Sequence, residues 1–189
     1  MSDQTFHVLG IAGSLRSGSF NRSLLEAARE LAPENLVIEV HDLKEIPLYD
    51  ADLDTDERRP VAVVHFKEAI ARADGLLIAT PEYNHNIPGV LQNAIDWASR
   101  PARRSVLRGK PAGIMGAATS GIGTARAQQI LKLVLEATLS PVMPHAGVVI
   151  GNATEKFDGE GNLVHEPTRR FLAAYLEELY RWIERFTTN

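Results

Sequence analysis

Cysteine is absent from the chain of 189 residues. A disulfide framework, a thiolate metal site and a cysteine nucleophile are therefore excluded, and any redox chemistry has to reside on a bound cofactor. Histidine is sparse, and its six copies form neither an HExxH motif nor another close ligand pair. The sequence therefore predicts no metal site.

Long apolar runs and a large excess of one charge are also missing. No apolar run approaches the ~20 residues of a membrane span, and the first residues lack the charged and apolar regions of a signal peptide. A formal net charge of −4 gives no reason to expect nucleic acid. We therefore expect a cytoplasmic protein with no membrane and no nucleic-acid partner.

The length and composition are those of an ordinary globular domain. The chain has 44% hydrophobic and 23% charged residues, and its length is close to the usual size of one domain. No internal repeat, linker or low-complexity segment divides it. We expect residues 1–189 to form a single domain.

Short apolar runs alternate regularly with longer amphipathic ones, which is typical of a parallel sheet covered by helices. The expected strands are 7–12, 36–40, 75–80, 111–117 and 146–151, and the expected helices are 21–31, 61–73, 89–98, 124–139 and about 168 onward. Asn21 is expected to cap the first helix, and the polar connection 42–59 is expected to be a surface excursion. The pattern predicts an α/β fold: a flavodoxin-like, doubly wound sheet of five parallel strands in the order 2-1-3-4-5, with helices on both faces.

The segment between the first strand and the first helix has the composition of an anion-binding loop, Gly10-Ile-Ala-Gly-Ser-Leu-Arg-Ser-Gly-Ser19. Its glycines allow tight turns, its serines donate hydrogen bonds, and Arg16 can clamp an oxyanion through two N–H groups. The N–H groups at the helix start add partial positive charge. The lysine of a Walker loop and a Gly-x-Gly-x-x-Gly fingerprint are both missing. We expect a phosphate site here; the alternative is an ordinary strand-to-helix turn.

Two further loops are expected beside this one, because a flavodoxin-like sheet binds its ligand outside the carboxyl ends of the strands at the switch point. The loop 80–89 is polar and aromatic and is stiffened by Pro81 and Pro88. The loop 117–124 is made of small residues that let a ring approach the backbone. Taken singly, each loop also fits an ordinary turn or helix entry. Together they predict a phosphate on the first loop and a planar ring against the other two, which is the shape of flavin mononucleotide (FMN).

These residues resemble the NAD(P)H-dependent FMN reductases, a family that includes bacterial quinone and chromate reductases. The likeness extends over about residues 6–150, and its matching elements are Gly13-Ser-Leu-Arg-Ser-Gly-Ser-Phe-Asn21, Pro81-Glu-Tyr-Asn84, Ile87-Pro-Gly-Val-Leu-Gln-Asn-Ala-Ile-Asp-Trp97, Gly109-Lys-Pro111 and the loop around Ser120. The resemblance implies hydride transfer from NAD(P)H through bound FMN to a small-molecule electron acceptor. Such an acceptor would be a quinone, free flavin, azo compound or chromate.

The resemblance also implies a set of cofactor-binding residues. The FMN phosphate would be held by Ser14, Arg16, Ser19 and Asn21, with the backbone of Phe20. The isoalloxazine and ribityl edge would be lined by Pro81, Glu82, Tyr83 and Asn84, and the other side of the ring by Ser120 and Gly121. The flavin carries the chemistry, so no catalytic acid or base is expected. Where many chromate and quinone reductases have a second aromatic residue after Asn84, this chain has His85.

Two other functions remain open at this point. One is a non-enzymatic, flavodoxin-like electron carrier or flavin sensor, because the fold alone does not separate a carrier from a reductase. The other keeps the fold but replaces flavin with a nucleotide or sugar phosphate.

The resemblance further implies a homodimer or homotetramer, and the expected helix 124–139 is apolar around much of its circumference, at Leu133 and Leu139 for example. Arg126 and Glu136 on this helix would pair across such an interface or remain solvated.

Overall fold

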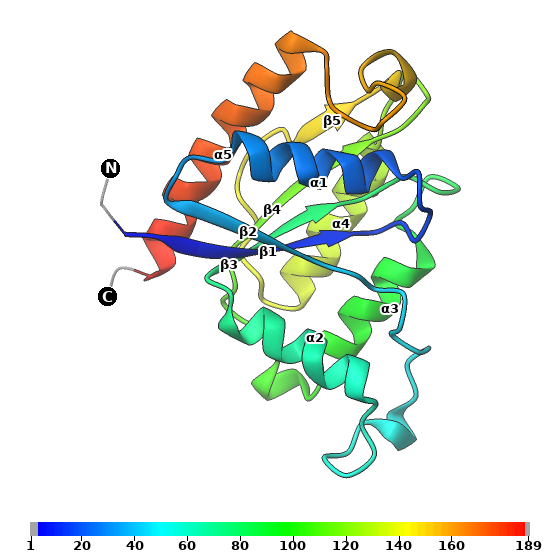
Figure 1. Ribbon diagram of the computed structural model, residues 1–189. Helices are drawn as coiled ribbons and strands as arrows, with labels where there is room; N and C mark the ends of the chain where they lie inside the picture. The colour runs from blue at the N-terminus through cyan, green and yellow to red at the C-terminus, as the bar shows by residue number, and fades with distance from the viewer. Residues whose placement is uncertain (1–3, 188–189) are drawn as a thin grey trace.

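A parallel sheet of five strands in the order β2-β1-β3-β4-β5 forms the centre of the molecule (Figure 1). The computed structural model describes residues 4–187. The strands are β1 (Phe6–Ala12), β2 (Leu36–His41), β3 (Gly75–Ala79), β4 (Ala112–Ala117) and β5 (Val148–Ile150). The helices are α1 (Phe20–Leu31), α2 (Val61–Arg72), α3 (Gly89–Ala98), α4 (Ala125–Ala137) and α5 (Glu166–Thr187). This order confirms the predicted flavodoxin-like, doubly wound sheet.

Helices cover both faces of the sheet because each strand sends successive side chains to opposite sides. On one face, Val8, Leu77 and Met115 pack in a cluster with buried residues of α1 and α5. On the other face, Leu9 and Ile78 pack with residues of α2, α3 and α4. Figure 1 shows α1 and α5 together on one side of the sheet and α2 and α3 on the other. Within residues 4–187, no helix is long and apolar enough to cross a membrane.

The edge at β5 differs from the prediction in length, since the strand has three residues rather than the expected 146–151. At Ile114 of β4, just before the pairing with β5 begins, the side chain of Tyr175 of α5 takes the place of a strand residue. Its buried hydroxyl accepts a hydrogen bond from Ile114 N at 2.7 Å and donates one to Ile114 O at 2.9 Å. A side chain thus satisfies strand atoms that would otherwise need another strand residue. Burial raises the pKa of this phenol above its ordinary value.

The connection between β2 and α2 is more firmly attached than a surface excursion. Leu43 and Ile46 are buried in the core on the α2 side of the sheet. Pro47 O accepts hydrogen bonds from Asn93 Nδ2 and Trp97 Nε1 of α3, each at 2.8 Å. The prediction for 42–59 was therefore wrong for its first part, because a few apolar side chains and α3 fix the chain to the body.

Candidate functional site

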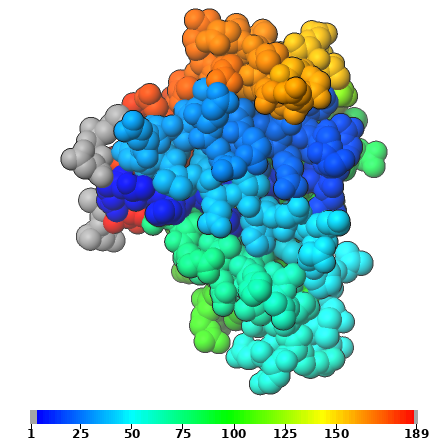
Figure 2. Space-filling model, in the orientation of Figure 1, coloured from blue at the N-terminus to red at the C-terminus, as the bar shows by residue number. Residues whose placement is uncertain are grey.

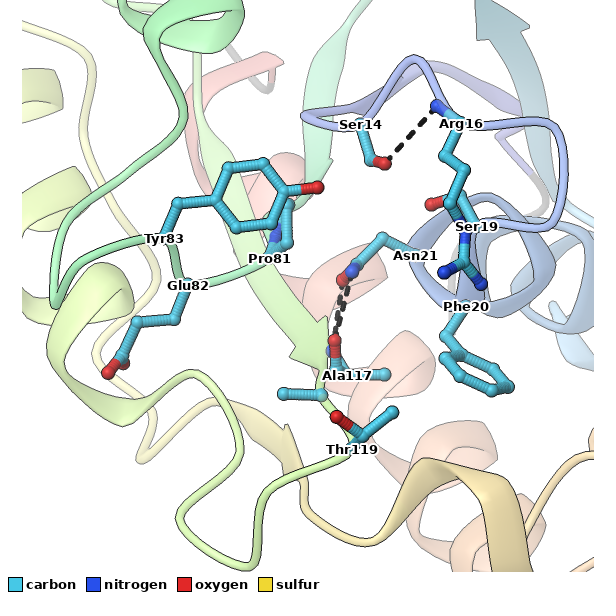
Figure 3. A pocket seen from close by; sticks show the side chains of 11 residues that line it. Ser14, Arg16, Ser19, Phe20, Asn21, Pro81, Glu82, Tyr83, Ala117 and Thr119 are labelled. Carbon is cyan, nitrogen blue, oxygen red and sulfur yellow. Dashed lines mark hydrogen bonds between the residues drawn. The ribbon is translucent and has the colours of Figure 1, made fainter.

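A cavity of about 170 Å³ lies at the carboxyl ends of β1, β3 and β4, where the connections after β1 and β3 lead to opposite faces and opposite edges of the sheet. Three loops form it: the β1–α1 loop (13–19), the β3–α3 loop (80–88) and the β4–α4 loop (118–124). The lining residues, drawn in Figure 3, are Ser14, Arg16, Ser19, Phe20, Asn21, Pro81, Glu82, Tyr83, Ala117, Ala118 and Thr119. The three loops expected from the sequence therefore meet at one place.

The β1–α1 loop presents a concentration of unused hydrogen-bond donors. Within the described part of the chain, the backbone N–H groups of residues 17–21 donate to no protein acceptor. Ser19 Oγ accepts from Arg22 N and Ser14 Oγ accepts from Arg16 N, each at 3.4 Å. Because a hydroxyl can accept and donate at once, both serines keep their hydrogen for a ligand. Together with the N-terminus of α1, this arrangement suits an anion.

Arg16 adds the full positive charge of the loop. Its guanidinium is exposed and donates from Nε to Gly18 O at 3.1 Å, with a second, shorter contact from Nη2 to the same oxygen. Across residues 4–187, no carboxylate forms an ion pair with it. A cation that is held only by a carbonyl of its own loop remains able to bind a phosphate oxygen.

Asn21 has a role that the sequence did not show. Its side chain is buried, donates from Nδ2 to Ala117 O at 2.9 Å and accepts from Ala117 N at 2.9 Å. The amide thus joins α1 to the end of β4 (Figure 3). The expectation that Asn21 caps the first helix was wrong, because α1 begins one residue earlier and Ser19 is its N-cap. The backbone N–H of Asn21 has no protein acceptor among residues 4–187 and is left for a ligand.

Glu82 and Tyr83 of the β3–α3 loop point in different directions (Figure 3). Tyr83 is 52% exposed and lies at the mouth of the cavity. The carboxylate of Glu82 points away from Arg16, Ser19 and Asn21 (Figure 3). It accepts hydrogen bonds from Arg126 N at 3.0 Å, Ala127 N at 3.2 Å and Arg126 Nε at 2.7 Å. Arg126 is therefore paired within its own chain.

The environment of Glu82 keeps it ionised. Burial acts to raise the pKa of its carboxyl group, but the hydrogen bonds from Ala127 N and from the side chain and backbone of Arg126 outweigh burial and hold that pKa below its usual value. A carboxylate at the first turn of a helix also interacts favourably with the helix dipole. The negative charge of Glu82 is thus compensated by α4.

Three of the predicted cofactor-binding residues, Asn84, Ser120 and Gly121, lie outside the cavity lining. Asn84 and His85 have φ angles of 50° and 64° and form the tip of a hairpin closed by two hydrogen bonds between Tyr83 and Asn86. This green hairpin projects at the right of Figures 1 and 2. Ser120 and Gly121 pack against the turn after β5, where Asn152 N donates to Ser120 O at 3.1 Å.

The residues that line the cavity from β4 are instead Ala117, Ala118 and Thr119. They precede Ser120 and Gly121, the residues predicted from the sequence, in the same loop, and the role of those two residues toward the cofactor stays a prediction. A usable signal was present, since ligands bind directly outside the carboxyl ends of strands and these residues are at the end of β4. Gly116, just before them, packs closely: a Cβ there would lie 2.2 Å from Thr124 Oγ1 and 2.3 Å from Thr80 O.

A doubly wound parallel sheet with an anion-binding loop after its first strand defines a flavodoxin-like protein whose ligand carries a phosphate. The model of the NADPH-dependent FMN reductase family matches residues 6–155, and the chain belongs to this family. The predicted enzyme class, an oxidoreductase, and the predicted cofactors, FMN and NAD(P)H, are thereby confirmed.

Relatives resemble the chain over almost its whole length. An NAD(P)H-dependent FMN reductase of Pseudomonas aeruginosa is 44% identical over 185 residues, which cover 98% of each chain. A 2-hydroxy-1,4-benzoquinone reductase of a Burkholderia species is 42% identical over 173 residues, 92% of this chain and 93% of the relative. The structure of FerB, a flavoenzyme NAD(P)H:(acceptor) oxidoreductase from Paracoccus denitrificans, superposes with a TM-score of 0.88 at 34% identity, covering 96% of this chain and 98% of that one.

Proposed function

We propose that the β1–α1 loop holds the phosphate of FMN and that the flavin ring lies between the β3–α3 and β4–α4 loops. The observation that carries this proposal is that two serine hydroxyls, the Arg16 guanidinium and the unused N–H groups of residues 19–21 belong to residues lining one side of the cavity. Such donors match the oxygens and the negative charge of a phosphate. Ser14, Arg16, Ser19, Phe20 and the backbone of Asn21 are the proposed phosphate ligands.

The opposite side of the cavity fits an uncharged, planar group. Pro81 and Ala117 are apolar, and the charge of Glu82 is compensated by α4. The cavity of about 170 Å³ is smaller than the ~300–1,000 Å³ of pockets that enclose a whole ligand. The ring would therefore extend over the exposed mouth beside Tyr83, with one face accessible to small molecules. Pro81, the backbone of Glu82 and Tyr83 would line it, with Ala117–Thr119 on the other side.

We further propose that a quinone is the electron acceptor and that the two substrates use the open face in turn. When bound, FMN supplies the redox chemistry by accepting a hydride equivalent from NAD(P)H and passing electrons to the acceptor. The residues of the chain position it and leave one face uncovered. A single open face predicts ping-pong kinetics, and the benzoquinone reductase and quinone reductases among the relatives support a quinone as acceptor.

The experiment that tests this function is an anaerobic absorption spectrum of protein reconstituted with FMN, followed after addition of NADPH or NADH. Prompt bleaching of the bound flavin, and its return when a benzoquinone is added, are expected. Bound flavin that neither nucleotide bleaches would contradict the reductase and leave an electron carrier or sensor. Protein that binds no FMN would show that the phosphate loop serves another ligand.

Three further properties are proposals of the same account. We expect residues 1–189 to form one FMN-binding domain. We expect a homodimer or homotetramer, because Leu133 of α4 is 65% exposed and Ile122 and Leu139 beside that helix are exposed as well. We place the protein in the cytoplasm, where reduced pyridine nucleotides are available. Sedimentation of the purified protein and fractionation of cells test the last two.

A further inference from the structure

The N-terminus of α4 is capped by a residue that lies 44 positions away in the chain. A helix leaves its first N–H groups without partners inside the helix, and a side chain from the preceding residue usually satisfies them. In α4 that residue is Thr124, whose side chain makes no cap hydrogen bond and instead accepts from Gln128 Nε2 at 3.0 Å. The N–H groups of Arg126 and Ala127 donate to Glu82 instead.

This arrangement, called the Glu82 cap below, consists of the Glu82 carboxylate with the N–H groups of Arg126 and Ala127 and the Arg126 guanidinium. The side chain of Glu82 is only 7% exposed, although it lies in a surface loop. Three N–H donors use its two oxygens. A nearly buried carboxylate whose oxygens accept hydrogen bonds from several donors is held in one position.

The Glu82 cap connects the two loops between which the flavin ring is proposed to lie. At their bases, the loops are joined by the end of the β3–β4 ladder, where Thr80 N donates to Met115 O at 2.9 Å. Further out, among the described residues, the hydrogen bonds between the β3–α3 loop and the start of α4 are those to Glu82. Its neighbours Pro81 and Tyr83 line the cavity, while its carboxylate points away from it (Figure 3).

We propose that Glu82 is a positioning residue, which fixes the spacing of the β3–α3 and β4–α4 loops for a planar ring through its contacts with α4 and not through contact with the ligand. This inference rests on the proposed FMN site. It gives the side chain a role different from that of lining the isoalloxazine edge. It also predicts that loss of the cap weakens binding of the flavin ring and leaves binding of the phosphate to the β1–α1 loop unchanged.

Riboflavin, which is FMN without its phosphate, separates the two roles. The dissociation constants of FMN and riboflavin are measured by flavin fluorescence quenching for wild type, Glu82→Ala and Glu82→Gln. Without the carboxylate, only a fraction of the molecules has the two loops correctly spaced. The apparent binding constant is then the wild-type constant multiplied by that fraction. We expect Glu82→Ala to weaken both flavins by the same factor, about tenfold for the loss of a helix cap.

Glu82→Gln is the conservative variant. Its amide oxygen still accepts from the two backbone N–H groups of α4, while its NH₂ group faces the Arg126 donor. We expect it to recover most of the affinity lost in Glu82→Ala. Glu136→Gln, at an exposed glutamate of the same helix, is the matched control and should leave both affinities unchanged.

The possible outcomes are distinct. A folded Glu82→Ala protein with wild-type affinity for riboflavin would overturn the positioning role, and so would a loss confined to FMN. A lower thermal unfolding midpoint without loss of flavin affinity would show that the cap stabilises α4 and nothing more, which also overturns it. Wild-type protein that binds neither flavin would overturn the proposed function itself, and this inference with it.

Discussion

The two sides of the cavity differ in how many of their polar and charged groups have partners within the protein. On the side of the β1–α1 loop, the N–H groups of residues 17–21 and the Arg16 guanidinium have few or no protein partners. On the side of the β3–α3 and β4–α4 loops, the charged group, Glu82, is fully engaged by α4. In the proposed site, the first side would bind by charge and unpaired donors, and the second by a fixed shape. A ligand with a charged end and a flat neutral end suits this division.

The two sides are joined by Asn21. Its side chain connects the start of α1 to the backbone of Ala117, so the distance between the phosphate loop and β4 is set by a buried amide. The contrast between an open side and a tightly packed side predicts different responses to substitution, which are given below from the largest effect to the smallest.

The sharpest contrast is between two glycines. A Cβ at Gly116 would lie 2.2 Å from Thr124 Oγ1 and 2.3 Å from Thr80 O, whereas a Cβ at Gly18 would meet only the flexible end of Arg16 at 3.6 Å. We expect Gly116→Ala to lower the free energy of unfolding by about 3 kcal/mol and Gly18→Ala to change it by less than about 0.5 kcal/mol. Urea unfolding measures both. Equal effects would contradict the difference in packing.

The next effect is on the residue that joins the two sides. Asn21→Ala leaves the N–H and C=O of Ala117 buried without partners, and we expect it to lower the free energy of unfolding by about 2–3 kcal/mol. Chemical denaturation in the absence of flavin measures this loss. Ser23→Ala, two residues further along α1 and half-buried, is the control. A loss of under about 0.5 kcal/mol for Asn21→Ala would show that water replaces the amide.

Arg16→Ala should act on binding and not on folding. Removing a charged donor from a phosphate weakens FMN binding by roughly 2 kcal/mol, about 30-fold. The unfolding midpoint without flavin should not change, because Arg16 is exposed and, among residues 4–187, its guanidinium hydrogen-bonds to Gly18 O alone. Fluorescence quenching gives the affinity and circular dichroism the midpoint. Unchanged FMN affinity would remove Arg16 from the site.

The smallest effect is a dependence on pH. The pKa of Glu82 in the folded protein lies below its ordinary value of 4.5. The carboxylate therefore contributes its stabilisation fully above about pH 4.5, and this contribution is lost as the pH falls through the folded pKa. Wild type should be more stable than Glu82→Gln at pH 6, and the difference should shrink towards pH 3. A difference that is constant with pH would show that the charge contributes nothing.

Local patterns were enough to predict the sheet order and the loops that form the site. The apolar runs and their spacing placed the strands, and the Ser/Gly composition of 13–19 identified the anion loop. The partners of individual side chains were not predictable in this way. Glu82 and Asn21 bind backbone atoms 44–45 and 96 residues away, respectively, and no local pattern shows which N–H groups at a distant loop will be free.

The motif that carried the family resemblance illustrates the same limit. Asn93 and Trp97 are its most recognisable residues, yet neither lines the cavity. Both donate to Pro47 O and thereby attach the connection after β2 to α3. This part of the motif thus reflects a packing requirement, and the cavity-lining residues Ala117–Thr119 are too ordinary in composition to be recognised without the sheet.

The most direct measurement is the ratio of FMN to riboflavin affinity in wild type and in Arg16→Ala. The two ligands differ only in the phosphate, so their ratio isolates the β1–α1 loop from the surfaces proposed to hold the ring. The account predicts that wild type binds FMN at least about 30-fold more tightly than riboflavin, and that Arg16→Ala removes most of this preference. Equal affinity of wild type for the two flavins would contradict the division of the site into a phosphate side and a ring side.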